Sequence, residues 1–164
     1  MSPDAAITAV LREARRYLGT TEHPPGSNRG LVVDYCNAEA GVALGSPWCC
    51  AWAMQVGRQA LGTQWPLPRT ASVMALVAWA QQRTTLGVWR STPGAGDLFL
   101  LWEPGLQPPR YGHTGFVEAV DGAGYSTVEG NTNPGGGREG YGVFARRRAV
   151  EPLTRFIQWT AAMG

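Results

Sequence analysis

Apolar side chains in the first half of the chain recur every three or four residues, the periodicity of helices that bury one face. The first stripe follows Ser2-Pro3, where a serine cap and a proline in the first turn favour a helix start. This stripe predicts a helix that ends at Gly19. The same periodicity predicts three more helices, over residues 31–40, 48–61 and 72–82.

The pattern changes after Gly87, where short apolar runs are separated by glycine, proline and aspartate. These runs predict strands over residues 97–102, 114–120, 125–129, 142–147 and 155–159. Helices first and strands later, joined by short links, predict an α+β fold with N-terminal helices packed on a mainly antiparallel sheet. Neither an internal repeat nor a long linker divides the chain, so we expect residues 1–164 to form a single domain.

Charge and composition exclude several classes of protein. The 14 basic residues, all arginine, and the 12 acidic residues leave a net charge of +2, too small to indicate nucleic-acid binding. No apolar run approaches the roughly 18 residues of a membrane span, so we expect no membrane insertion. Residues 1–18 lack the apolar segment of a signal peptide, and we expect synthesis in the cytoplasm without one.

The three cysteines, Cys36, Cys49 and Cys50, are too few and too irregularly spaced for a disulfide framework. Cys49 and Cys50 open a predicted helix, and the positive end of a helix dipole favours a nucleophilic thiolate. Only one of two adjacent side chains can point into a cleft, so either is a candidate. The alternative is that both are small buried apolar residues, as Cys36 is expected to be.

A nucleophilic thiol needs a base, and the chain contains two histidines. His23 lies in a proline-rich loop and is expected to be solvated. His113 begins a predicted strand between two glycines, from where it can project toward a helix end. If the next strand pairs with it in a hairpin, Glu129 returns toward His113 and can orient the imidazole. Asn131 is an alternative acceptor or an oxyanion donor.

Each of these assignments has a structural alternative. Residues 129–137 are rich in glycine and asparagine and are typical of a turn whatever their chemistry. Trp48 and Trp102 flank the candidate segments, where they either line a groove for sugar or peptide or pack in the core. The run Arg146–Arg148 is typical of a solvated sheet edge, or attracts an anionic polymer. The spacing of cysteine, histidine and acidic residues matches no zinc or calcium site, so we expect no metal and no other cofactor.

Four of these segments, in this order, resemble motifs of the CHAP family of cysteine- and histidine-dependent amidohydrolases and peptidases. The similarity covers roughly residues 5–160. The segments are Pro47-Trp48-Cys49-Cys50-Ala51-Trp52, Gly96-Asp97-Leu98-Phe99-Leu100, Gly112-His113-Thr114-Gly115-Phe116-Val117 and Val128-Glu129-Gly130-Asn131. The resemblance implies a papain-like fold related to the NlpC/P60 enzymes.

The same resemblance assigns roles to individual residues. Cys49, which directly follows the tryptophan, is the implied nucleophile in preference to Cys50. His113 is the implied base and then acid, and Glu129 orients it with Asn131 as an auxiliary. The calcium-binding loop of some phage members is absent from the sequence, which implies no metal requirement.

What the family implies is hydrolysis of an amide bond in bacterial peptidoglycan, by an N-acetylmuramoyl-L-alanine amidase or a peptide endopeptidase. We expect a monomer that acts at the cell wall after export, injection or lysis, as a phage endolysin or a secreted antibacterial effector. A secreted toxin would have an immunity protein as partner. The alternatives are a papain-like acyltransferase or protease with a protein substrate, and an inactive wall-binding module.

Overall fold

The helices lie where the periodicity predicts them. The structure is a computed structural model, which describes residues 1–122, 124–135 and 140–163. The helices are α1 (Pro3–Arg16), α2 (Leu31–Ala40), α3 (Cys49–Leu61) and α4 (Val73–Gln81), with short 3-10 helices η1 (Gly62–Gln64), η2 (Thr84–Leu86) and η3 (Trp159–Ala162). The side chain of Ser2 accepts a hydrogen bond from the N–H of Ala5, and that of Ser72 from Ala75. Both serines therefore cap a helix start.

The strands form one sheet in the order β1-β6-β2-β3-β4-β5, with every neighbouring pair antiparallel. They are β1 (Trp89–Arg90), β2 (Leu98–Glu103), β3 (Arg110–Asp121), β4 (Gly124–Thr132), β5 (Gly142–Arg148) and β6 (Arg155–Ile157). The five predicted strands are present, and the sequence missed β1, which is too short to show a pattern. Residues 129–132 belong to β4 rather than to a turn, and Gly136 and Gly137 of the predicted turn lie outside the described residues.

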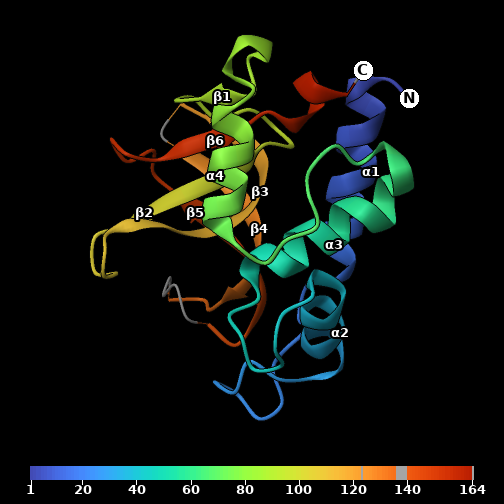
Figure 1. The fold of residues 1–164 in the computed structure, drawn as a ribbon, viewed down its shortest axis with the longest axis vertical. Helices are drawn as coiled ribbons and strands as arrows, with labels where there is room; N and C mark the ends of the chain where they lie inside the picture. Colours follow the sequence, from blue (N-terminus) through green and yellow to red (C-terminus); the bar gives the residue numbers. More distant parts are fainter. Residues whose placement is uncertain (123, 136–139, 164) are drawn as a thin grey trace.

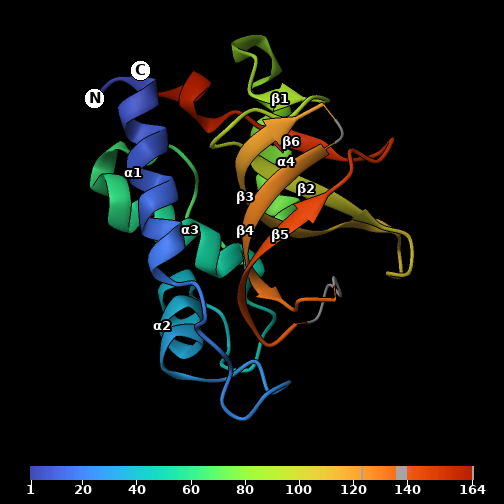
Figure 2. The same ribbon diagram turned by 180° about the vertical axis from the view of Figure 1, so that it is seen from behind.

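The helices gather on one face of the sheet (Figures 1 and 2). Helix α3 contacts β3 and β4, α4 contacts β3, and α1 and α2 pack against α3. Trp48, Trp52, Leu76, Phe116 and Trp159 are completely or almost completely buried in this layer, which forms the main apolar core. The predicted α+β architecture, with N-terminal helices on an antiparallel sheet, is therefore confirmed.

The other face of the sheet carries a smaller cluster of four buried side chains, Phe99, Val117, Tyr125 and Phe156. No helix of the described residues covers this cluster (Figure 2). Its aromatic rings pack edge to face or tilted against one another. The two faces of the sheet therefore differ: one is buried by helices, and the other by side chains of its own strands.

Helix α2 has the predicted bounds but presents a different face to the core. The sequence predicted packing by Leu31, Val32 and Tyr35, yet Leu31 is 91% exposed and Tyr35 is about half exposed. The inward positions are Val33 and Cys36, three residues apart, with Val32 only partly buried. The prediction was wrong by one residue because so short a helix has apolar residues on both possible faces.

Strands β3 and β4 separate at the point where α3 begins. Their pairing runs from Asp121 and Gly124 to Phe116 and Val128. Beyond this point β3 pairs only with β2, and β4 only with β5. In the resulting fork Gly130 lies against α3, because a Cβ there would come within 3.0 Å of the rings of Trp48 and Trp52. The fork directs the N-terminus of α3 at the strand segments that carry His113 and Glu129.

Candidate active site

Cys49 is the first residue of α3 and is 5% exposed. Burial alone would raise the pKa of its thiol, but a hydrogen bond and charge interaction with His113 lower it. The backbone N–H groups of Thr114 and Cys50 lower it further, so the net direction is downward. The thiolate is therefore favoured here by a cation on one side and by the helix start on the other.

A buried carboxylate holds the residue that precedes Cys49. The indole N–H of Trp48 donates to Glu22 Oε1 at 2.8 Å, and Glu22 Oε2 accepts from the backbone N–H of Asn28 at 3.0 Å. Trp48 has no exposed surface, so it anchors the start of α3 and offers no face for the substrate contact predicted for it. Glu22 lies in a loop without a recognisable pattern, so the sequence did not indicate it as a site residue.

His113 lies in β3 opposite Leu101 of β2 and is completely buried. Its Nε2 is 2.9 Å from Glu129 Oε2. Nε2 carries the proton of this bond because an ionised carboxylate only accepts. This bond leaves Nδ1 as the ring nitrogen available to Cys49, and Nδ1 has no hydrogen-bond partner among the described residues. Burial alone would lower the pKa of His113, but the hydrogen bonds with Cys49 and Glu129 raise it to about 9.

Glu129 accepts hydrogen bonds on both oxygens. Arg148 donates from Nε to Oε1 and from Nη2 to Oε2, each at 2.6 Å, and Thr127 Oγ1 donates to Oε1 at 2.5 Å. With the bond from His113, each oxygen therefore accepts two. Burial alone would raise the pKa of this carboxyl, but Arg148 first and His113 second lower it to about 2. Glu129 is consequently an anion at neutral pH.

Arg148 is a second residue of this site that the sequence did not indicate. Its side chain is 14% exposed, whereas the run that contains it was predicted to be a solvated edge. The prediction holds for Arg147, which is exposed and pairs with Asp121. Alternation along β5 is the signal that could have separated the two, since successive side chains of a strand point to opposite faces.

The glycines beside His113 make room for its neighbours, as predicted. A Cβ at Gly115 would lie 2.9 Å from the carbonyl oxygen of Val128 and 3.1 Å from Glu129 Cγ. A Cβ at Gly112 would lie 2.8 Å from Glu103 Cγ. Gly115 thus allows the Glu129 side chain to cross β3 and reach the imidazole.

The other candidates have different surroundings. Cys50 is fully buried, its thiol lies 3.5 Å from the carbonyl oxygen of Thr70, and burial raises its pKa well above the ordinary value. Burial likewise raises the pKa of Cys36 to about 12. Neither thiol is poised as a nucleophile, and His23 is exposed in its loop.

Asn131 lies two residues beyond Glu129, at a bulge in the pairing of β4 with β5. Its φ of 55° is left-handed, a conformation that asparagine tolerates better than most residues. The side chain is buried, and its Oδ1 has no hydrogen-bond partner among the described residues. Its auxiliary role stays a prediction.

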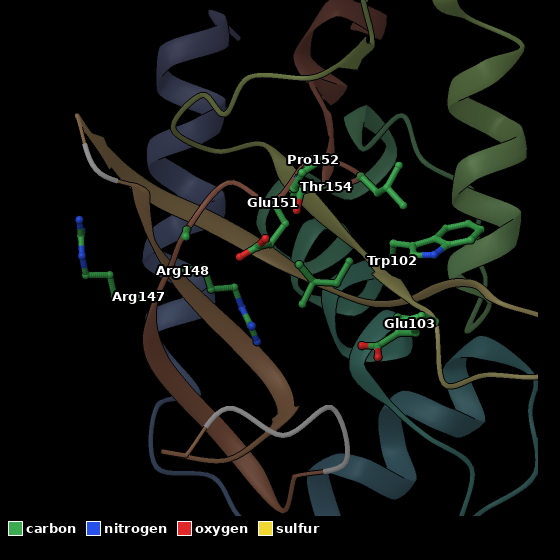
Figure 3. A pocket seen from close by; sticks show the side chains of 11 residues that line it. Trp102, Glu103, Arg147, Arg148, Glu151, Pro152 and Thr154 are labelled. Carbon is green, nitrogen blue, oxygen red and sulfur yellow. The ribbon is translucent and has the colours of Figure 1, made fainter.

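A cavity of about 590 Å³ opens beside the Arg148 end of the site (Figure 3). Its lining includes Leu101, which pairs with His113, and Trp102, which is 37% exposed. Figure 3 shows the Arg148 side chain directed into this space and Arg147 directed away from it. Trp102 is thus placed where a ligand could contact it, and its predicted role in substrate binding stays a prediction.

Within residues 1–122, 124–135 and 140–163, no three histidine, cysteine or acidic side chains lie close enough together to hold a metal ion. In the same residues, no helix has the length and apolar character needed to cross a membrane.

Two comparisons find similar proteins. The family model described as the CHAP domain matches residues 41–131, a segment that contains Cys49, His113, Glu129 and Asn131. A solved structure titled "The crystal structure of Ly7917" is similar with 20% sequence identity and a TM-score of 0.47. That match covers 92% of this chain and 61% of the other, so this chain spans less than two thirds of its length. The comparison with curated proteins gives no match.

Proposed function

The chain belongs to the CHAP family of peptidoglycan-related amidases and peptidases, and from this premise we propose that it hydrolyses an amide bond of peptidoglycan with Cys49, His113 and Glu129, here called the triad. The bond is either the sugar–peptide bond cut by an N-acetylmuramoyl-L-alanine amidase or a peptide bond cut by an endopeptidase. The domain is of the papain-like NlpC/P60 type.

The observation that carries the proposal is the arrangement of the imidazole between two partners. Glu129 holds Nε2 at 2.9 Å, which leaves Nδ1 for Cys49. The pKa of the thiol is lowered and that of the imidazole is raised to about 9, so both shifts favour a thiolate beside an imidazolium. A thiolate beside a proton donor is the arrangement that thiol acyl transfer requires.

The reaction has two steps. The Cys49 thiolate attacks the amide carbonyl carbon, and backbone N–H groups at the start of α3 stabilise the oxyanion of the tetrahedral intermediate. His113 gives its proton to the leaving amine as the C–N bond breaks. In the second step neutral His113 takes a proton from water, whose oxygen attacks the thioester, and the acid product leaves with the thiolate restored.

The cavity beside the triad provides space for the part of the substrate that adjoins the bond that is cut. Trp102 provides an aromatic face there, and aromatic faces stack well on sugar rings and peptide planes. We place the action of the protein at the bacterial cell wall, as a phage endolysin or a secreted antibacterial effector.

Mass spectrometry of purified sacculi incubated with the protein tests the proposal, because the new termini identify the bond that is cut. Wild type is expected to release fragments with new amino termini, and Cys49→Ala is expected to release none. Cys50→Ala is the matched control, since this neighbouring thiol is buried away from His113, and it should keep most of the activity.

Two outcomes would contradict the proposal. One is the same fragments from Cys49→Ala as from wild type. The other is retention of the wild-type protein on sacculi without any cleavage over a range of pH and salt, which would indicate a wall-binding module. Incorporation of a labelled amine into a protein acceptor, without cleavage of sacculi, would instead identify an acyltransferase.

A further inference from the structure

Arg148 holds the third member of the triad from the side opposite His113. Its Nε and Nη2 atoms contact the two oxygens of Glu129 separately, each at 2.6 Å. Such a two-pronged contact fixes the plane of a carboxylate as well as its charge, which a single ammonium group does not do. The guanidinium also lies over the ring of Phe99, 5.4 Å from its centroid, and that ring is 5.7 Å from the imidazole of His113.

Arg148 also separates the triad from solvent. Glu129 has no exposed surface, whereas Arg148 is 14% exposed and lines the cavity of about 590 Å³. Figure 3 shows its side chain directed into that space, which Glu151 and Glu103 also line. The guanidinium therefore forms part of the wall between Glu129 and the water of the cavity. Removal of this wall would hydrate the carboxylate and weaken its hold on the imidazole.

We propose that Arg148 is a positioning residue, which keeps Glu129 ionised and oriented so that His113 presents Nδ1 to Cys49. The geometry alone requires an ionised carboxylate, because Glu129 accepts four hydrogen bonds and a protonated acid would have to donate one of them. Arg148 supplies two of the four, together with a full positive charge that does not depend on the protonation of His113.

Other charged groups surround this contact. His113 on β3 lies next to Glu129, and His113 in turn interacts with Cys49 on α3. Tyr125 on β4 and Glu103 on β2 act on Arg148, and Glu151 acts on Tyr125. None of these replaces a cation beside Glu129. Loss of Arg148 therefore lets protonation of Glu129 begin at higher pH, and the imidazolium and thiolate lose their support over the same range.

The test is the rate of Cys49 alkylation by iodoacetamide as a function of pH, in wild type, Arg148→Gln and Arg148→Lys. This readout needs no substrate, so it remains informative even if the proposed peptidoglycan activity is wrong. We expect Arg148→Gln to move the acid limb of the profile upward by about one to three pH units. At a fixed pH on that limb, each unit is a tenfold slower alkylation.

Arg148→Lys should move the acid limb in the same direction by a smaller amount, because it keeps the charge but loses one of the two contacts. If Arg148→Gln does not fold, the shift of the acid limb in Arg148→Lys is by itself the test of the proposal. Arg147→Gln, which removes the exposed neighbour, is the control and should leave the profile unchanged. A purely structural role for Arg148 predicts fewer reactive molecules with an unchanged acid limb, and that result in either variant would overturn the proposal.

Discussion

The two ends of the triad are built from different materials. At the thiol end, Cys49 lies on a helix start fixed by close apolar packing, with Trp48 and Trp52 against Gly130. At the carboxylate end, Glu129 lies in a polar arrangement of Arg148, Thr127 and His113. The first end depends on shape and the second on charge, so substitutions at the two ends should fail in different ways.

The difference also explains how a thiol and a carboxylate can both be buried. A thiol is tolerated in an apolar layer, and it becomes an anion only when a cation approaches it. A carboxylate in a buried site needs a permanent partner, because an unpaired buried charge is strongly destabilising. His113 lies between the two ends and transmits the charge of Glu129 to the thiol of Cys49.

Loss of the imidazole separates the two ends and should have the largest effect. We expect His113→Ala to reduce hydrolysis of peptidoglycan by about 10⁴-fold or more, since removal of one member of such a unit costs almost as much as removal of all. The measurement is the rate of fragment release from sacculi at neutral pH. His23→Ala, in the exposed loop before α2, should keep the wild-type rate. A loss of less than tenfold in His113→Ala would mean that another group acts as the base.

Neutralisation of the carboxylate end should have the next largest effect. We expect Glu129→Gln to lower the rate by roughly 10²- to 10⁴-fold, because an amide can present its NH₂ group to Nε2 and favour the wrong tautomer. The same variant leaves Arg148 buried without a counter-ion, which should lower the free energy of unfolding at pH 7 by about 3 kcal/mol.

The sign of the pH dependence distinguishes this ionic effect from a loss of packing. The pKa of Glu129 is lowered to about 2, so its ionised form stabilises the fold above the ordinary carboxyl pKa of about 4.3. That contribution is lost as the pH falls toward 2. Urea denaturation should therefore show a deficit of Glu129→Gln that shrinks in acid, and a deficit independent of pH would contradict the charge assignment.

Overpacking of the thiol end should have the smallest effect. A Cβ at Gly130 would come within 3.0 Å of Trp52 and Trp48, so we expect Gly130→Ala to lower the free energy of unfolding by about 1–3 kcal/mol. Its pH dependence should match that of wild type. Gly105→Ala is the control, since no atom lies within 4 Å of the added Cβ. A stable Gly130→Ala variant would show that the fork between β3 and β4 widens without cost.

The thiol end could be predicted from the sequence because its determinants are adjacent in the chain. Trp48, Cys49 and the apolar periodicity that follows them indicate a helix start, and the glycines around His113 indicate a close approach. The hairpin that returns Glu129 to His113 follows from the lengths of two neighbouring strands. These local signals left Cys49 and Cys50 as alternatives, and the resemblance to the CHAP family favoured Cys49.

The carboxylate end could not be predicted as far, because its determinants are distant in the chain. The contact between Arg148 and Glu129 spans 19 residues, and alternation along the strand separates Arg147 from Arg148 without saying which of the two points inward. The hydrogen bond from Trp48 to Glu22 spans 26 residues and begins in an irregular loop. The inward face of α2 was also misassigned, since the choice depends on how α3 packs against it.

The state of the Cys49 thiol is the most direct test of the account. It can be measured by titration of thiolate ultraviolet absorbance, taken as the difference between wild type and Cys49→Ser. We expect a thiolate signal below the pH of about 8.5 at which a free cysteine titrates, because His113 lowers the pKa of this thiol. The signal should move to higher pH in His113→Ala. A wild-type signal that begins only at or above pH 8.5 would contradict the account.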